Sequence, residues 1–185
     1  MFVLDHSGSI SAHQQESMIN LTVHLVNKAD VGRDRVQFGA VRYSDQPEVL
    51  FYLNTYPNRS AVVENLRRRR DTGGSTYTAR ALRHTDALFT EEYGSRIRQD
   101  VKQMLIIITD GKSHDRDMLS DTALKLREKG IVIFAVGVDK AEQDELEIMA
   151  GNKNNTIHVS DFDKLKDIYL PLQESMCTNA QECKL

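Results

Sequence analysis

Two short, uninterrupted runs of apolar residues constrain the fold of this chain most, namely residues 104–108 (MLIII) and 131–136 (IVIFAV). Such runs have no polar face, which is typical of strands that are covered on both sides in a parallel sheet. They are far shorter than the ~18 to 20 apolar residues that a membrane-spanning helix requires. The sequence therefore predicts central strands of a parallel sheet and no insertion into a membrane.

Amphipathic patterns alternate with the predicted strands along the whole chain. A turn at residues 44–47 is too short for a crossover, so the strands on either side of it should pair antiparallel at one edge. Alternating strands and helices predict a doubly wound α/β fold with helices on both faces of a mostly parallel sheet. We expect strands at residues 2–4, 35–43, 48–53, 104–108, 131–136 and 156–159, and helices at 11–28, 58–70, 76–89, 117–129, 142–150 and from 161 onward. The first of these helices should begin with a capping box formed by Ser11 and Gln14.

Side chains that carry oxygen gather in three loops, two of which follow the ends of predicted strands. The loops lie at residues 5–9 (DHSGS), 73–78 (GGSTYT) and 109–111 (TDG). In a doubly wound sheet, ligands bind beyond the carboxyl ends of the strands, so these loops should meet at one site. Carboxylate and hydroxyl oxygens are suited to Mg²⁺ or a similar hard cation. The candidate metal ligands are Asp5, Ser7, Ser9, Thr76 and Asp110.

These two carboxylates and three hydroxyls fall short of the six or so oxygens that such a cation prefers. A position should therefore remain for water or for an external ligand. Gly73 and Gly74 are expected to let the backbone approach the centre of the site. The alternative interpretation is that the hydroxyls only cap helices and that Asp110 caps a turn. Taken together, and with the resemblance of these motifs described next, the five oxygens favour the metal site.

In these motifs the chain resembles the von Willebrand factor type A domain with its metal-ion-dependent adhesion site (MIDAS). The resemblance covers essentially the whole chain and implies a mostly parallel six-stranded sheet with one antiparallel edge strand. It also implies that the five candidate residues are the ligands of Mg²⁺, or of Mn²⁺ or Ca²⁺. We expect the domain to span residues 1–175, and residues 176–185 to form a C-terminal linker that holds Cys177 and Cys183.

Within that family, the sequences of four segments are most similar to those of the type A domains of collagen VI, especially in its alpha-4, alpha-5 and alpha-6 chains. The segments are residues 41–47 (VRYSDQP), 51–56 (FYLNTY), 87–92 (ALFTEE) and 108–113 (ITDGKS). The residues after position 138 run directly into a predicted helix. This leaves no room for the extra helix of the collagen-binding integrin inserts, which argues against an integrin.

The resemblance implies a non-enzymatic adhesion or assembly module of the extracellular matrix. Such a module is secreted and belongs to a larger, oligomeric multidomain chain that binds matrix proteins, such as collagens or other type A domains. A carboxylate from the partner would complete the metal site, with Tyr77 and His114 as candidate residues of the ligand rim. The alternative is a purely structural bead of a collagen VI-like microfibril, with no regulated metal-dependent ligand.

Other classes of function have less support. The chain has 24 basic and 27 acidic residues, a net charge of −3, which does not favour a nucleic-acid partner. A phosphotransferase with Asp5 as nucleophile would resemble the haloacid dehalogenases, which have a second aspartate where this chain has Ser7. No glycine-rich phosphate-binding motif follows a predicted strand either. We therefore expect no enzymatic activity and no catalytic residues.

Several further features leave alternatives open. The two cysteines can pair with each other, pair outside this chain or stay free. The run of four arginines at residues 67–70 is expected to be the solvated end of a helix. The functional alternative is that this run attracts polyanions. His6 is expected to be a solvated or hydrogen-bonded loop histidine rather than a pH sensor beside the metal, and the same holds for His114.

The ends of the chain and its sequons bear on where the protein works. The sequence begins inside its first predicted strand, without a signal peptide, so we expect a piece excised from a longer protein. Asn-x-Ser/Thr triplets are candidate glycosylation sites if the protein is secreted. They begin at Asn20, Asn58 and Asn154.

Overall fold

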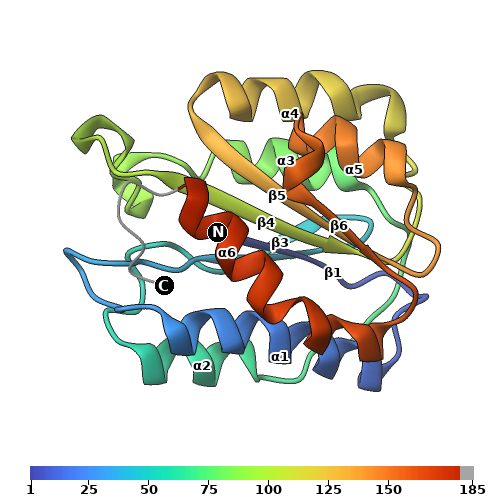
Figure 1. Ribbon diagram of the computed structural model, residues 1–185, viewed down its shortest axis with the longest axis horizontal. Helices are drawn as coiled ribbons and strands as arrows, with labels where there is room; N and C mark the ends of the chain where they lie inside the picture. The colour runs from blue at the N-terminus through green and yellow to red at the C-terminus, as the bar shows by residue number, and fades with distance from the viewer. Residues whose placement is uncertain (180–185) are drawn as a thin grey trace.

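A six-stranded sheet forms the centre of the computed structural model, which describes residues 1–179 (Figure 1). The strands are β1 Phe2–Asp5, β2 Ala40–Tyr43, β3 Pro47–Phe51, β4 Gln103–Thr109, β5 Ile131–Val138 and β6 Thr156–Val159. Their order across the sheet is β3-β2-β1-β4-β5-β6, and only the pair β2–β3 is antiparallel. The predicted fold class is therefore confirmed.

Three helices cover each face of the sheet (Figure 1). The helices α1 Ala12–Lys28, α2 Arg59–Leu66 and α6 Tyr169–Asn179 lie on one face, and α3 Thr78–Asp86, α4 Leu119–Glu128 and α5 Gln143–Ala150 lie on the other. Short 3₁₀ helices occupy Glu91–Tyr93, Ile97–Gln99, Arg116–Met118, Lys153–Asn155 and Phe162–Ile168. Successive side chains of β1 point to opposite faces, so Phe2 and Leu4 pack in the α1 core while Val3 packs in the α3 core.

Burial on both faces explains the apolar runs found in the sequence. In β4, Leu105, Ile107 and Ile108 are completely buried, and every residue of β5 except Val132 is buried. At roughly 25 cal/mol per Å² of apolar surface removed from water, such strands contribute much of the free energy of folding. No helix among residues 1–179 is both long and apolar enough to span a membrane.

The helix that follows β1 begins as its sequence predicts. Ser11 is the N-cap of α1, and its hydroxyl accepts a hydrogen bond from the Gln14 amide at 3.4 Å. The Gln14 side chain in turn accepts a hydrogen bond from the Ser11 amide at 2.8 Å. This capping box fixes where the loop after β1 ends and α1 starts.

Among the predicted elements that are shorter in the structure, three differ most, and each has a local cause. The strand predicted at residues 35–43 is regular only from Ala40, because Phe38 stacks on Phe2 and the ladder with β3 shifts register between Ala40 and Val41. The helix predicted at residues 58–70 ends at Leu66. Arg70 folds back there and donates hydrogen bonds to the carbonyls of Asn65 and Arg68, at 3.1 and 2.8 Å.

The helix predicted at residues 76–89 begins only at Thr78. The residues before it are held in a loop, because the carbonyl of Thr76 accepts the His114 amide at 2.8 Å and the Tyr77 amide donates to Ser44 at 3.2 Å. The last predicted helix begins as a 3₁₀ helix at Phe162 and becomes α-helical at Tyr169. α6 continues to Asn179, beyond residue 175. The domain and linker boundary at that residue stays a prediction.

The antiparallel edge of the sheet has an irregular outer strand. Pro47, the first residue of β3, has no amide hydrogen to offer. Glu48, the next residue, is exposed and pairs with Arg42 of β2, whose Nη2 lies 2.6 Å from the carboxylate. The edge therefore ends in a proline and an ion pair instead of a continuous row of free amides.

We expect Gly137→Ala to destabilise the domain by about 1–3 kcal/mol, the usual cost of overpacking a core. A Cβ added at Gly137 of β5 would lie 2.5 Å from Leu146 Cδ1 and 2.9 Å from Ala141 Cβ, so α5 would have to move away from the sheet. Urea unfolding followed by circular dichroism measures the change. Gly73→Ala is the control, since a Cβ there meets nothing within 4 Å. Equal stability of the two variants would contradict this account of the α5 packing.

Candidate metal-binding site

The three loops predicted to converge do so at the carboxyl ends of the parallel strands, on the right-hand side of Figure 1. Backbone hydrogen bonds connect them. Gly8 donates to the carbonyl of Gly74 at 2.9 Å, and Gly73 donates to that of His6 at 3.0 Å. The loop after β4 joins the other two through the hydrogen bond between the His114 amide and Thr76. The loop positions are thus set by the backbone as well as by the side chains.

A chain of hydrogen bonds connects four of the five candidate ligands. Asp5 Oδ1 accepts the Ser7 amide at 2.8 Å, and the hydroxyls of Ser7 and Ser9 lie 3.1 Å apart. Ser9 Oγ then donates to Asp110 Oδ1 at 3.0 Å. Thr76 borders the same group, because its Oγ1 lies 3.9 Å from the point where Gly111 would carry a Cβ. The structure brings all five residues together, and their role as metal ligands stays a prediction.

The two carboxylates are buried without a cationic partner. Asp5 has no exposed surface and Asp110 is 7% exposed, and neither forms an ion pair with any residue in the described part of the chain. Burial raises the pKa of Asp5, and the nearby charge of Asp110 raises it further. Burial also raises the pKa of Asp110, with a smaller contribution from Asp139. The charge of Lys140 lowers the pKa of Asp110 only in part, so the two carboxylates carry negative charge that no direct ion pair with a described residue balances.

The helix-capping alternative for the hydroxyls does not describe this structure. The N-cap of α1 is Ser11, and the N-cap of α3 is Tyr77, which makes no side-chain capping bond. Among residues 1–179, no three or more His, Cys, Asp and Glu side chains gather where they could hold a metal. The donor set is instead two carboxylates and three hydroxyls, which fits a hard cation such as Mg²⁺ better than a soft one.

Only one of the two glycines before Thr76 has a special role. Gly74 has a φ of +77°, and a Cβ there would collide with the Asp45 carboxylate. Gly73 also approaches the loop after β1, since its amide donates to the carbonyl of His6, but a Cβ at Gly73 would meet nothing within 4 Å, so the expectation that a side chain would be in the way holds only for Gly74. Asp45 also accepts the Ser75 amide at 2.9 Å. Gly74 thus permits the contact that fixes the loop before Thr76.

The predicted rim residues lie next to each other beside the site. The rings of Tyr77 and His114 are 5.6 Å apart, and the Arg80 guanidinium lies 4.3 Å from the centre of the Tyr77 ring. His114 is exposed but is not free, because its Nδ1 accepts the Thr76 amide at 3.1 Å. His114 therefore holds a candidate ligand in place, and its contact with a partner stays a prediction.

Residues that sequence reasoning passed over hold the site together. Thr109 Oγ1 donates to Asp5 Oδ2 at 2.8 Å, joining the ends of β4 and β1. Asp115 is buried, and its carboxylate accepts the amides of Ala79 and Arg80 at 2.9 and 2.7 Å and the hydroxyl of Ser113 at 2.7 Å. An aspartate five residues after Asp110 was visible in the sequence, but nothing indicated that it would cap the start of α3.

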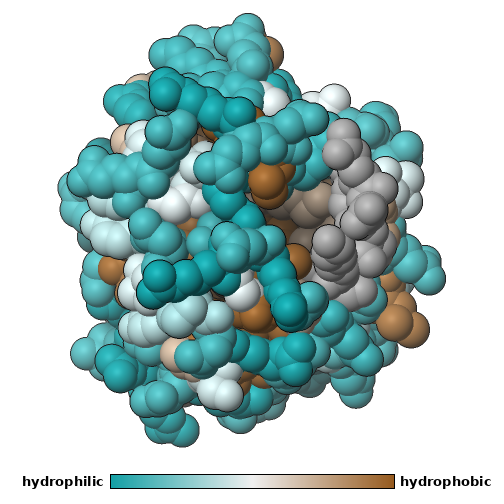
Figure 2. Space-filling view, turned by 90° about the vertical axis from the view of Figure 1, so that its left-hand side faces the viewer, coloured by the Kyte–Doolittle hydropathy of each residue, from teal (hydrophilic) through white to brown (hydrophobic). Residues whose placement is uncertain are grey.

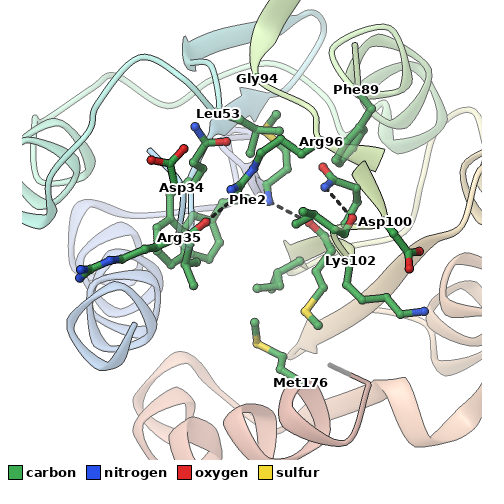
Figure 3. Close-up of a pocket in the computed structure, with 18 residues that line it drawn as sticks. Phe2, Asp34, Arg35, Leu53, Phe89, Gly94, Arg96, Asp100, Lys102 and Met176 are labelled. Carbon is green, nitrogen blue, oxygen red and sulfur yellow. Dashed lines mark hydrogen bonds between the residues drawn. The ribbon is translucent and has the colours of Figure 1, made fainter. Parts of the chain in front are cut away.

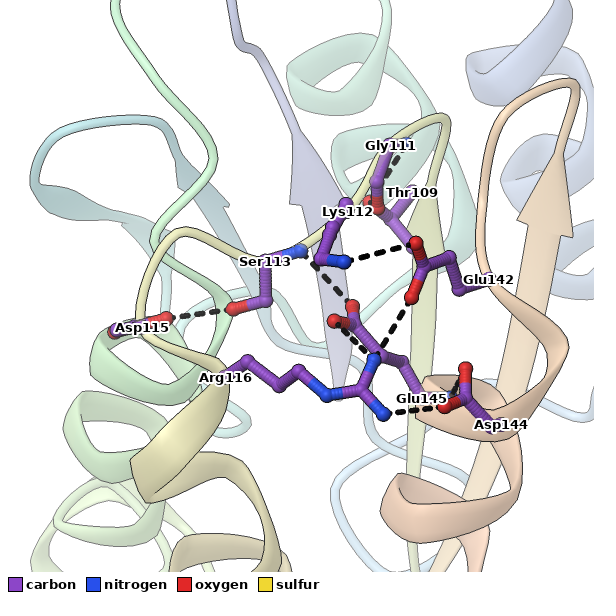
Figure 4. A network of polar contacts seen from close by, with 9 residues as sticks. All are labelled: Thr109, Gly111, Lys112, Ser113, Asp115, Arg116, Glu142, Asp144 and Glu145. Carbon is purple, nitrogen blue, oxygen red and sulfur yellow. Dashed lines mark hydrogen bonds and ion pairs between the residues drawn. The ribbon is translucent and has the colours of Figure 1, made fainter.

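A network of ion pairs fastens the loop after β4 to α5 (Figure 4). Arg116 lies among the carboxylates of Glu142, Asp144 and Glu145, with its Nη1 2.8 Å from Glu142 and 3.1 Å from Glu145. Buried Glu145 also accepts the Ser113 amide at 2.9 Å. Its pKa is raised by burial, against the lowering effects of this amide and of Arg116. The loop that carries Asp110 is therefore attached to both α3 and α5.

His6 lies inside the fold rather than in solvent. It is 6% exposed, and its Nδ1 has no hydrogen-bond partner among the described residues. Burial, followed by the charge of Arg42, lowers its pKa to about 4. The side chain is therefore not solvated, and of the two alternatives the hydrogen-bonded one holds, because the ring is hydrogen-bonded to the backbone of Asp71.

Cys177 and the sequon asparagines are not among the residues that the described contacts of the site involve. Cys177 of α6 is in a disulfide, and Cys183 lies outside the described residues. Asn58 and Asn154 are exposed, although Asn58 Oδ1 also caps α2 by accepting the Ala61 amide at 3.0 Å. Asn20 is half-buried within α1. Glycosylation at all three positions stays a prediction.

A cavity of about 500 Å³ opens at the opposite end of the sheet (Figure 3). Apolar side chains such as Phe2 and Met176 form its floor, and Asp34, Arg35 and Lys102 lie at its edge. Figure 2 shows this face, where apolar residues lie in a hollow surrounded by hydrophilic ones. None of the five candidate ligands lines the cavity, so it is separate from the site.

Comparison with known proteins agrees with the architecture and the motifs. A family model described as von Willebrand factor type A domain matches residues 1–170. The chain is 74% identical over 182 residues to the collagen alpha-5(VI) chain of Homo sapiens, which covers 98% of this chain and 7% of that protein. It is 45% identical to the Homo sapiens collagen alpha-6(VI) chain, covering 100% of this chain and 8% of the relative.

A solved structure shares the fold. Proximal thread matrix protein 1 from the mussel byssus, with a zinc-occupied MIDAS motif, matches with a TM-score of 0.88 and 26% sequence identity. The match covers 95% of this chain and 47% of the mussel protein. The zinc belongs to that protein, and the metal preference of this chain is a separate question.

We expect Asp110→Asn to abolish the response of the domain to Mg²⁺ without unfolding it. The amide keeps an oxygen for the Ser9 hydroxyl but removes a buried negative charge, so the chelated variant should melt no lower than the chelated parent. Mg²⁺ at a hundredfold excess over its Kd should stabilise the parent by about 2.7 kcal/mol. Differential scanning calorimetry measures both effects. Asp100→Asn, at the opposite end of the sheet, is the control, and an unchanged Mg²⁺ response in Asp110→Asn would contradict the site.

We expect Asp115→Ala to destabilise the domain by about 1–3 kcal/mol, because two buried amides and one hydroxyl lose their acceptor. The Mg²⁺-induced rise in melting temperature should also shrink, since α3 and the Thr76 loop lose their attachment. Thermal unfolding with and without Mg²⁺ separates the two effects. Asp117→Ala removes an exposed carboxylate from the same segment and should change neither. A full Mg²⁺ response in Asp115→Ala would show that this carboxylate does not position the site.

Proposed function

We propose, on the premise that this chain belongs to the von Willebrand factor type A domain family, that it is a non-enzymatic binding module of the extracellular matrix. In this proposal the chain attaches to a protein partner through a divalent-cation site, with Mg²⁺ as the expected ion and Mn²⁺ or Ca²⁺ as substitutes. The metal ligands are Asp5, Ser7, Ser9, Thr76 and Asp110.

The observation that supports this proposal most is the uncompensated charge at the carboxyl ends of the strands. Asp5 and Asp110 are both buried, lie on adjacent strand ends and lack a Lys or Arg partner in the described part of the chain. Burial disfavours the charged forms of both carboxylates, as the raised pKa values of both groups indicate, and the charge of Asp110 adds to the effect at Asp5. A bound cation offsets that cost and the neighbouring hydroxyls supply further oxygens.

The ligand expected from this chemistry is an acidic side chain of another protein. When bound, a divalent cation with five protein ligands of total charge −2 retains a position that favours an external carboxylate. Neighbouring residues of this chain then hold the metal ligands in position. Thr109 fixes the Asp5 carboxylate at 2.8 Å, and His114 fixes the Thr76 loop. No covalent step is assigned to the site.

The wider setting is part of the same proposal, since the chain spans about 7–8% of the length of the collagen VI relatives. Those relatives are named as chains of a collagen, and identity of 74% over nearly the whole chain supports a similar context. We therefore propose a secreted module within a larger, oligomeric multidomain chain of the matrix. Candidate partners are collagens, other matrix proteins and other type A domains.

Binding to matrix partners in the presence and absence of metal tests this function. We expect the chain to bind immobilised fibrillar collagen or purified collagen VI microfibrils in Mg²⁺, and to lose at least tenfold in affinity with EDTA or with Asp110→Ala. The reason is that a metal-bridged carboxylate contributes nothing once the metal or a ligand is removed. Surface plasmon resonance measures the affinity, with Asp100→Asn as the charge-matched control.

Circular dichroism establishes that Asp110→Ala still folds. If binding persists unchanged after both treatments, the partner docks on another surface, and the alternative of a structural bead without a metal-dependent ligand gains support.

A further inference from the structure

We propose that the arginine turn, defined as residues 67–70, and the start of α1 form an acceptor pocket for a second acidic side chain of the same protein partner. The inference rests on the proposed function, because the first acidic side chain is the one bound at the metal site. It adds a specificity element: the partner should present two carboxylates at a defined spacing. The expected partner segment is therefore an acidic peptide rather than a peptide with one isolated Asp or Glu.

The pocket is a hollow of about 310 Å³ between the arginine turn and α1. Its lining residues are Ala12, Gln15, Arg69, Arg70, Asp71 and Thr72. The side chain of Gln15 closes one side, because its Nε2 donates to the carbonyl of Arg70 at 3.0 Å. The hydrogen bonds from Arg70 to the carbonyls of Asn65 and Arg68 keep the turn folded back toward α1. The pocket thus has a fixed wall on the turn and another on the helix.

The pocket adjoins the candidate metal site through both of its walls. Ala12 follows the candidate ligand Ser9 by three residues, and Thr72 precedes the candidate ligand Thr76 by four. At no more than about 3.6 Å per residue, these separations are at most about 11 and 14 Å. The hydrogen bond from Gly73 to His6 holds the turn against the loop after β1. One extended peptide segment therefore reaches both places.

The pocket has more basic than acidic residues in its lining, and one of its arginines has no ion-pair partner among the described residues. Arg69 is exposed and has neither a hydrogen bond nor an ion pair within residues 1–179. Arg67 makes only a 3.5 Å contact with Asn20, and Arg68 lies 3.8 Å from Glu64 in an exposed pair, which contributes little. Asp71 is the only acidic residue in the lining, and the first turn of α1 has none. An incoming carboxylate would meet a cation that has no partner of its own.

An acidic peptide fits this arrangement better than a sulfated polysaccharide. The chain as a whole has a net charge of −3, so long-range attraction of an extended polyanion is weak. The positive groups are instead gathered at one pocket whose lining residue Thr72 is at most about 14 Å along the backbone from Thr76, the span of about four extended residues. Such a spacing selects a short segment with two acidic side chains.

A matched set of synthetic peptides tests the proposal. The parent peptide is acetyl-Gly-Glu-Gly-Gly-Glu-Gly-amide, and two variants carry Gln in place of the first or the second Glu. Each is titrated in Mg²⁺ into the wild-type domain, Arg69→Gln and Arg33→Gln, with binding followed by NMR chemical shifts. Arg33 is an exposed arginine outside the pocket lining, so Arg33→Gln makes the same change of charge away from it.

We expect Arg69→Gln to weaken binding of the two-glutamate peptide about two- to fivefold, the range of an exposed charge pair. The single-glutamate peptides should bind the wild type and Arg69→Gln equally, and Arg33→Gln should behave as the wild type. The effect of Arg69→Gln should disappear at about 1 M salt, where the Debye length falls to about 3 Å.

Three results would overturn the inference. If the two-glutamate peptide binds the wild type and Arg69→Gln with equal affinity, the pocket does not bind a second carboxylate, and the proposed metal site is unaffected. Absence of Mg²⁺-dependent binding by all three peptides removes the proposed function together with it. In the third result, a heparin oligosaccharide binds in EDTA and Arg69→Gln abolishes this binding, while Arg69→Gln has no effect on the peptides. The pocket would then be a site for sulfated polysaccharides.

Discussion

The proximity of two buried carboxylates is the constraint on which the rest of this structure depends. Asp5 and Asp110 end neighbouring parallel strands and lie under 10% exposed, without a positive side chain of the described chain to balance them. Their oxygens are supported by hydroxyls and amides, from Ser7, Ser9 and Thr109. Hydrogen bonds alone leave the raised pKa values of both acids in place. The two buried acids therefore favour the binding of a cation from outside the described chain.

The loops around these carboxylates are fixed by residues that have no place in the donor set. Asp115 joins the loop after β4 to the start of α3, and Arg116 with Glu145 joins it to α5 (Figure 4). His114 and Gly74 fix the Thr76 loop from its two sides. The candidate ligands therefore lie on loops whose freedom is limited by rigid elements, an arrangement that lowers the entropic cost of binding.

The sequence was most informative where one physical effect dominates. The apolar runs of β4 and β5 predicted the sheet, and the Ser11 and Gln14 pair predicted the start of α1. The motifs after β1 and β4 predicted four side chains that a chain of hydrogen bonds connects in the structure. It was least informative where distant residues compete. The helix expected to reach Arg70 ends at Leu66 because the Arg70 guanidinium binds nearby carbonyls, and His6 is buried by strands that follow it in the chain. Asp115 reads as an ordinary loop residue until α3 is placed against it.

The edge strand β3 affects whether copies of the domain can pair through their sheets. β3 opens with a proline, and the Arg42–Glu48 ion pair lies across it. An edge of this kind is a poor template for backbone pairing with another sheet, which is how natural β-proteins avoid uncontrolled polymerisation. Copies of the domain at high concentration would then remain individually folded, and contacts between them would be left to side chains.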